Sequence, residues 1–199
     1  MITSIRNGLL VALIWAAWWP QQAAADVSGM LNLCAGCHGE DGISPEARVP
    51  TIGGLYAEYL ENALRAYRSH SRDCGDTPLM CKTADRLSDE EIDELAHHFA
   101  DLEYRPLRQD FDAALAAQGA EIHANGCGLC HGDAPDEATD GPILHGQRRE
   151  YLSRALLAYA DDERDQPRGM ARHISKLTPV DLDALAHYYA SYQPQAVAD

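Results

Sequence analysis

The residues best suited to chemistry in this chain are two copies of one pentapeptide. Cys34-Ala35-Gly36-Cys37-His38 and Cys127-Gly128-Leu129-Cys130-His131 share the pattern C-x-x-C-H, which attaches c-type haem. On a helical turn both thiols face the same side, so they can add to the two vinyl groups of one porphyrin. The histidine that follows lies on that side and can bind the iron. We therefore predict two covalently bound haem c groups, attached through Cys34 and Cys37 and through Cys127 and Cys130, with His38 and His131 as iron ligands.

Two other sites could use the same cysteines. A zinc site could be built from all four, or they could form a pair of disulfides. Zinc would require the two motifs to come together across the chain, and it would leave the histidine after each motif without a role. Haem accounts for every residue of both motifs.

The second axial ligand decides whether each iron is suited to electron transfer or to catalysis, because methionine closes the iron to substrate and raises its potential. Met80 and Met170 occupy equivalent places, each seven residues before the leucine that precedes a final helix. We predict them as the ligands opposite His38 and His131. Met30 lies only four residues before Cys34, on the side of His38. His70 and His173 are the competing ligands, and neither has a counterpart in the other half.

Cys74 and Cys81 are the remaining cysteines, and they flank Met80 in sequence. An exported protein meets oxidising conditions, so we predict a disulfide between them that closes the loop carrying Met80. The alternative is that Cys81 itself binds the iron as a thiolate. The other histidines are predicted to lie on the surface or to pack between helices: His97, His98, His123, His145 and His187.

The elements that must position these residues repeat about every 90 residues, which indicates a duplicated domain. Each motif is preceded by a predicted helix, at residues 27–33 and 111–124, the second with Phe111, Leu115, Gln118 and Ile122 on one stripe. Each is followed by an amphipathic helix with tyrosines at helical spacing, and then by a capped helix at Ser88 or Thr178. No stretch alternates like a strand. We predict an all-α fold of two tandem class I cytochrome c-type domains, each with a few helices around one covalently bound haem.

The first 25 residues resemble a secretory signal peptide, with Arg6, an apolar run and an alanine-rich cleavage site before Asp26. The alternative is a retained membrane anchor. We expect a periplasmic protein with no membrane span in the mature chain, a first domain at residues 26–103 and a second at 104–199, joined by a linker at about 103–110. The formal net charge of −15 disfavours nucleic acid and favours a partner with a basic docking patch.

Taken together, the haem motifs and the two methionines resemble the dihaem cytochrome c4 family. The segment from Tyr104-Arg105-Pro106 through Phe111 to His123, and Ile143-Leu144-His145-Gly146-Gln147 with Tyr151-Leu152, are similar to the dihaem cytochrome subunit of flavocytochrome c sulfide dehydrogenase. This resemblance implies a protein that transfers electrons and is not itself an enzyme. It implies a flavoprotein partner subunit, which would hold the FAD and oxidise sulfide, and a small cytochrome c or similar acceptor. The Cys74–Cys81 segment departs from the pattern of that family.

Two further functions stay open at the level of sequence. One is a free cytochrome c4-like shuttle that feeds a terminal oxidase or reductase. The other is a dihaem enzyme, such as a peroxidase, which would need an open iron or a histidine or cysteine ligand at one haem. The matched methionines disfavour the enzyme.

Overall fold

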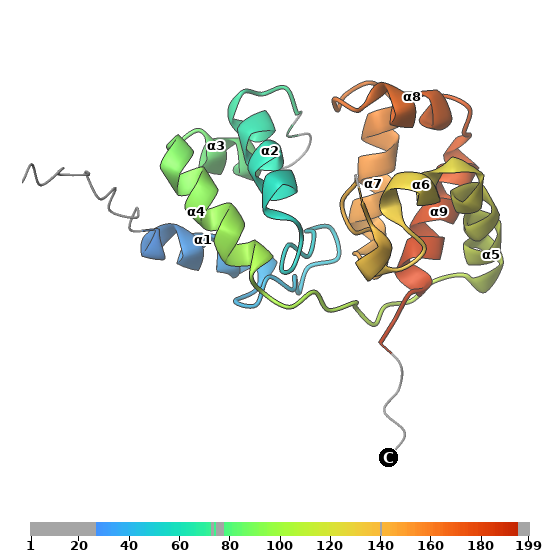
Figure 1. The fold of residues 1–199 in the computed structure, drawn as a ribbon, viewed down its shortest axis with the longest axis horizontal. Helices are drawn as coiled ribbons and strands as arrows, with labels where there is room; N and C mark the ends of the chain where they lie inside the picture. The colour runs from blue at the N-terminus through green and yellow to red at the C-terminus, as the bar shows by residue number, and fades with distance from the viewer. Residues whose placement is uncertain (1–26, 73, 75–77, 140, 195–199) are drawn as a thin grey trace, which may run out of the picture.

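The computed structural model describes residues 27–72, 74, 78–139 and 141–194. Within these residues the fold is helical and contains no β-strand, as the sequence predicts. Figure 1 shows the helices in two groups that lie side by side, one from each half of the chain. The predicted signal peptide, residues 1–25, lies outside the described residues.

The two groups repeat the same order of helices. The first half contains α1 (Ser28–His38), α2 (Ala57–Arg68), α3 (Leu79–Ala84) and α4 (Asp89–Ala100). The second half contains α5 (Ala113–Ile122), the π-helical turn η1 (His123–Cys127), α6 (Gly128–His131), the 3-10 turn η2 (Pro135–Glu137), α7 (Arg149–Ala160), α8 (Arg168–Ile174) and α9 (Pro179–Ser191). Thus α1 corresponds to α5, η1 and α6 together, and α2, α3 and α4 correspond to α7, α8 and α9.

The last helix of each half begins at the predicted cap. The Ser88 hydroxyl accepts from the Glu91 amide, and the Glu91 carboxylate accepts from the Ser88 amide. Thr178 and Asp181 form the same reciprocal pair, with Pro179 at the first helical position. Both arrangements satisfy amides that have no partner inside the helix. The predicted apolar stripes of these helices are buried: Ile92, Leu95, Ala96 and Phe99 in α4, and Leu182, Leu185, Ala186 and Tyr189 in α9.

The stripe predicted for residues 111–124 is confirmed only in part. Ile122 packs against the core of the second half and Leu115 is partly buried, but Gln118 is exposed and Phe111 is 40% exposed. The fully buried residues of α5 are Ala116 and Gly119. The physical reason is a close approach of α5 to α9. A Cβ atom on Gly119 would lie 2.1 Å from the Ala184 carbonyl oxygen, so this face needs small residues and has no room for large ones.

The connection between the halves, residues 103–112, contains no helix and runs along one edge of the molecule (Figure 1). Several hydrogen bonds hold the halves together. The Gln147 side chain accepts from the Thr51 amide at 2.8 Å and donates to the Thr51 carbonyl at 2.8 Å. The Tyr56 hydroxyl donates to the Ala138 carbonyl at 2.7 Å. Ala138 and Ile143 also join the apolar cluster of the first half around Leu55 and Phe99.

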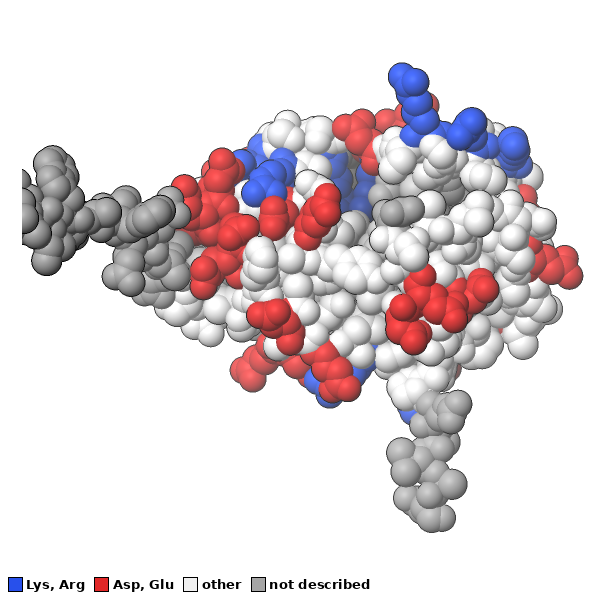
Figure 2. Space-filling model, viewed as in Figure 1, with Lys and Arg blue, Asp and Glu red and all other residues white. Residues whose placement is uncertain are grey.

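The surface has an uneven charge distribution. Figure 2 shows acidic side chains over both halves and a group of basic side chains over α8, at the top of the second half. Among the described residues, no helix has the length and apolar character that a bilayer crossing requires.

Candidate haem-binding sites

The two C-x-x-C-H motifs are presented differently by the backbone. The first ends the continuous helix α1. The second lies in α6 and follows a π-helical turn in which Gly126 has a φ of 148°. All four motif cysteines are free thiols, and Cys130 is exposed. Burial raises the pKa of the Cys34 and Cys127 thiols, so these thiols are neutral.

The two motif histidines make the same hydrogen bond. His38 Nδ1 lies 2.9 Å from the Pro50 carbonyl oxygen, and His131 Nδ1 lies 2.9 Å from the Pro142 carbonyl oxygen. A carbonyl can only accept, so Nδ1 carries the proton and Nε2 keeps a free lone pair. Burial lowers the pKa of both imidazoles. Each is therefore held as the neutral tautomer that a metal needs, with its ring fixed by a partner outside the metal's own ligands.

The two methionines lie on equivalent short helices. Met80 is in α3 and Met170 is in α8, and both side chains are partly buried. Met170 packs against the apolar core of the second half.

The two competing histidines lie in different surroundings. His70 is exposed, has a φ of 57°, and its Nε2 lies 3.1 Å from an Asp85 carboxylate oxygen. The His173 ring lies against Gly126, where an added Cβ atom would come within 2.3 Å of it. The assignment of Met80 and Met170 as the axial ligands stays a prediction.

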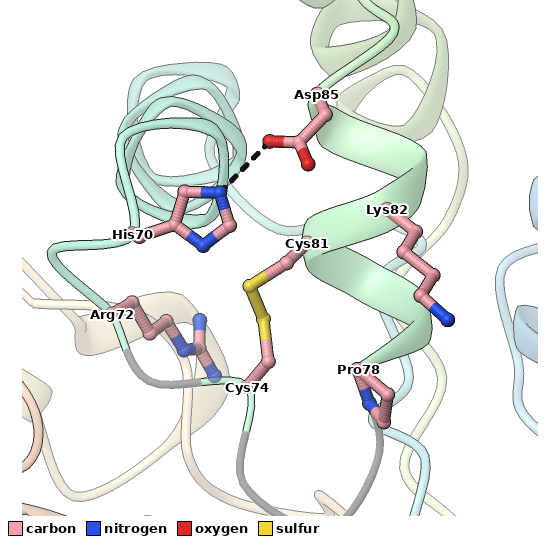
Figure 3. A pocket seen from close by; sticks show the side chains of 7 residues that line it. All are labelled: His70, Arg72, Cys74, Pro78, Cys81, Lys82 and Asp85. Atoms are coloured by element: carbon pink, nitrogen blue, oxygen red, sulfur yellow. Dashed lines mark hydrogen bonds and ion pairs between the residues drawn. A yellow bond between two sulfur atoms is a disulfide. The ribbon is translucent and has the colours of Figure 1, made fainter.

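Cys74 and Cys81 form a disulfide in the structure, which ties the start of α3 to the preceding loop. Figure 3 shows this bond in the wall of a hollow, with His70 and Asp85 paired on its far side. The cavity has a volume of about 340 Å³ and is also lined by Arg72, Pro78 and Lys82. With its sulfur bonded to Cys74, Cys81 is not available as a thiolate ligand.

Two arginines meet where the halves join, and each binds a tyrosine of the other half. Arg72 donates to the Tyr151 hydroxyl at 3.2 Å, and Arg164 donates to the Tyr59 hydroxyl at 3.4 Å. Their backbones form an isolated antiparallel bridge. Each guanidinium also stacks on a tyrosine of its own half, Arg72 on Tyr67 at 4.2 Å and Arg164 on Tyr159 at 4.4 Å.

No carboxylate of the described residues pairs with either arginine. Arg72 is buried, at 9% exposed, and two like charges removed from water need an anion beside them. Burial raises the pKa of Tyr151, but Arg72 and Arg164 outweigh that effect and lower it to about 7. A haem carries two propionate carboxylates, so this pair of arginines fits the anionic edge of the cofactor.

The thiol pairs, the neutral histidines and the unpaired arginines together fit two haem c groups. In that state Cys34, Cys37, Cys127 and Cys130 would form the thioethers, and His38 with Met80 and His131 with Met170 would bind the irons. Haem supplies one-electron chemistry. The Pro50 and Pro142 carbonyls fix the imidazole tautomers, and Arg72 and Arg164 would offset the charge of the propionates.

The sequence reasoning did not find the arginine and tyrosine cluster. Its signal was present, because Tyr59 and Tyr151, Tyr67 and Tyr159, and Arg72 and Arg164 are each 92 residues apart. The sequence does not show, however, that each arginine donates a hydrogen bond to a tyrosine of the other half.

A second polar cluster lies inside the second half. His123 and His145 are each 1% exposed, so they pack in the core, and their rings contact Tyr188 and Tyr189. His123 Nδ1 lies 3.0 Å from the Tyr189 hydroxyl, and Nε2 lies 3.1 Å from Asp133. Burial lowers the pKa of His145 to about 4. These histidines are helix-packing residues, which is one of the two roles predicted for them.

Comparison with known proteins gives one match in each half. A family profile described as cytochrome c matches residues 25–103, and one described as cytochrome c oxidase, cbb3-type, subunit III matches residues 114–188. Cytochrome c-554(548) of Halomonas halodenitrificans is 36% identical over 40% of this chain and 96% of its own length.

Similar proteins that span both halves are also known. The thiosulfate dehydrogenase electron acceptor of Thiomonas intermedia is 28% identical over 94% of this chain and 91% of its own length. The crystal structure of reduced recombinant cytochrome c4 from Pseudomonas stutzeri superimposes with a TM-score of 0.72, at 26% identity, over 86% of this chain and 99% of that one. Over a shorter segment, 35% of this chain, the cytochrome subunit of sulfide dehydrogenase from Chlorobaculum tepidum is 39% identical across 59% of its own length.

Proposed function

Because the chain belongs to the cytochrome c family, in its dihaem cytochrome c4 group, we propose that it carries electrons one at a time between a periplasmic dehydrogenase of inorganic sulfur compounds and a downstream acceptor. The observation that carries this proposal is the repeated ligand set. Each half offers a thiol pair, a neutral histidine fixed by a backbone carbonyl, and a partly buried methionine at the same place. Two irons closed on both sides favour electron transfer over catalysis.

Within this function, the first candidate donor is a flavoprotein subunit that oxidises sulfide and holds the FAD, with this chain as its cytochrome subunit. The similarity to the sulfide dehydrogenase subunit supports it. The electrons would then pass to a small cytochrome c or similar acceptor. Residues 1–25 would direct export, in keeping with haem attachment outside the cytoplasm.

A second candidate is a free cytochrome c4-like carrier. The relatives that align over most of the chain favour it, because they include a thiosulfate dehydrogenase electron acceptor and cytochromes c4. The two candidates share the same haem chemistry and differ only in whether the chain has a permanent partner.

Purification of the native protein separates the candidates. The protein is followed by haem absorbance from the periplasm through gentle chromatography, and the fractions are assayed for flavin and for a second chain. Flavin and a larger chain in fixed ratio with haem would assign it to a flavocytochrome. Haem alone, on a single type of chain, would assign it to the free carrier.

The ligand set has its own test. Met80→Ala and Met170→Ala should each remove the methionine-to-iron charge-transfer band of one ferric haem and leave the other. A variant with both bands intact would contradict the ligand assignment for that methionine.

A further inference from the structure

The most exposed large apolar side chain in the described part of the chain belongs to Leu129, at 81%. It lies between the attachment residues Cys127 and Cys130, and Cys130 is itself exposed. The corresponding residue of the first motif is Gly36. Both halves therefore present an apolar side chain beside a haem attachment point, but Leu33, next to Cys34, is 46% exposed, whereas Leu129 is 81% exposed and lies between its two cysteines.

An acidic loop borders this leucine. The loop of residues 132–139 folds against the motif, since Thr139 donates from its hydroxyl to the Leu129 carbonyl at 3.4 Å and from its amide to the Cys130 carbonyl at 3.1 Å. It carries three exposed acidic residues, Asp133, Asp136 and Glu137. Asp133 contacts the buried His123. Within the described part of the chain, Asp136 and Glu137 have no basic partner.

The first motif has a weaker form of this combination. Leu33 beside Cys34 is 46% exposed, and the motif is followed by exposed Glu40 and by Asp41, which pairs with Arg105 of the linker at 2.6 Å. Gly36 offers no side chain between the two attachment cysteines. The second half therefore differs in having the more exposed apolar side chain, placed between its two attachment cysteines, with Asp136 and Glu137 at its border.

We propose that Leu129, with Asp136 and Glu137 at its border, forms the docking surface through which the second haem exchanges electrons with a small basic electron-transfer protein. The inference rests on the proposed function and adds the surface and the charge of the partner. Acidic groups around the contact would speed the encounter with a basic protein. An apolar centre would then hold the partner in place, as buried apolar anchors do in other interfaces.

The test uses the haem-loaded, full-length protein in its ferric form and zinc-substituted mitochondrial cytochrome c, a basic protein. The excited zinc porphyrin gives one electron to a ferric haem, and the electron later returns, so the decay of the excited state measures docking and transfer together. The second-order rate constant is measured from low to high ionic strength.

Leu129→Ala should lower this rate constant about fivefold at moderate salt, the effect of losing an apolar anchor worth about 1 kcal/mol. The matched variant is Gly36→Leu. A Cβ atom at Gly36 has nothing within 4 Å, so this change adds an apolar side chain to the other motif without a clash. Since Asp41 beside the first motif is paired with Arg105, Gly36→Leu should change the rate constant by less than about twofold. Haem content is checked in both variants.

Asp136→Asn with Glu137→Gln should flatten the salt dependence of the rate constant. The control is Glu90→Gln with Glu94→Gln on α4, which removes the same charge from the first half and should leave the salt slope nearly unchanged. Asp133 is left in place because it contacts buried His123.

The inference is overturned if Leu129→Ala leaves the rate constant unchanged, or if the α4 variant flattens the salt dependence as much as the Asp136 and Glu137 variant. The proposed function fails in a different way. It would fail if the unaltered protein, loaded with two haems, showed no reversible one-electron reduction at either iron, a measurement that needs no partner.

Discussion

The two halves of this molecule keep the same groups for haem and use different means to support them. Both hold the motif histidine through a proline carbonyl at 2.9 Å, and both contribute an arginine and a tyrosine to the junction. Their supporting structure differs. α5 begins at Ala113, 14 residues before Cys127, and packs tightly on α9, whereas α1 begins at Ser28, only six residues before Cys34.

The loop before the predicted axial methionine differs as well. In the first half a disulfide closes it, and in the second half no cysteine occurs there. The second half instead has a buried cluster of histidine and tyrosine that includes Tyr189. At the position that corresponds to Tyr189, the first half has the apolar residue Phe99. The comparison teaches that a duplicated domain can diverge in helix packing, core polarity and covalent bonds as long as the cofactor contacts and the junction stay fixed.

The largest expected effect separates the two haems. Cys127→Ser with Cys130→Ser should reduce the haem content from two per chain to one, and so should Cys34→Ser with Cys37→Ser, because each thiol pair would attach its own cofactor. Haem per protein, measured as the pyridine haemochrome, and the mass of the chain check this. A variant that kept two haems would show that the motifs do not act independently.

Helix packing provides the next largest effect. Gly119→Val should destabilise the second half by about 3 kcal/mol, because its side chain would collide with the α9 backbone. Gly29→Ala on α1 is the control, since a Cβ atom there meets nothing within 4 Å, and it should be neutral or slightly stabilising. Thermal unfolding followed by circular dichroism measures both. Equal losses of stability in the two variants would mean that α1 packs as tightly as α5.

The disulfide distinguishes the loops that carry the methionines. Cys74→Ser with Cys81→Ser should cost about 2 kcal/mol of stability, and it should weaken the binding of Met80 to its iron while sparing Met170. Denaturant titration followed at the methionine-to-iron absorbance band measures this. If the absorbance bands of both methionines disappeared at the same denaturant concentration, the disulfide would support the whole molecule and not only the first half.

Removing either arginine of the junction should have a similar effect on the haem potentials. Arg72→Gln or Arg164→Gln should lower a haem potential by on the order of 50 mV, about a sevenfold change in a one-electron equilibrium, because a nearby positive charge favours the reduced, less positive haem. Arg168→Gln, an exposed change on α8, serves as the control. Spectroelectrochemical titration measures the potentials. Unchanged potentials in both junction variants would contradict the pairing with propionates.

The helix caps should give the smallest effect, and a nearly equal one in the two halves. Ser88→Ala and Thr178→Ala should each cost about 1 kcal/mol, since each removes the side-chain acceptor for an unpaired amide. Chemical denaturation of the two variants checks this. A much larger loss in one half would show that its final helix depends on the cap for more than local hydrogen bonding.

The sequence determined the parts of this protein that depend on local spacing. Cysteines three apart with a histidine after them define the haem motif without any knowledge of the rest of the fold. The caps at Ser88 and Thr178 and the apolar stripes of α4 and α9 follow from hydrogen bonding and periodicity within a few residues. The repeat of about 90 residues then gave two domains of one kind.

Tertiary structure decided the features that depend on distance in space. Small residues at Ala116 and Gly119 form the buried face of α5 only because α9 comes so close, and a hydrophobic pattern cannot reveal that approach. Arg72 reaches Tyr151 of the other half, and Gln147 reaches Thr51. His123 and His145 are buried for the same kind of reason. Spacing along the chain fixes which groups can act together on one helical turn, but contacts between distant segments depend on how the helices pack.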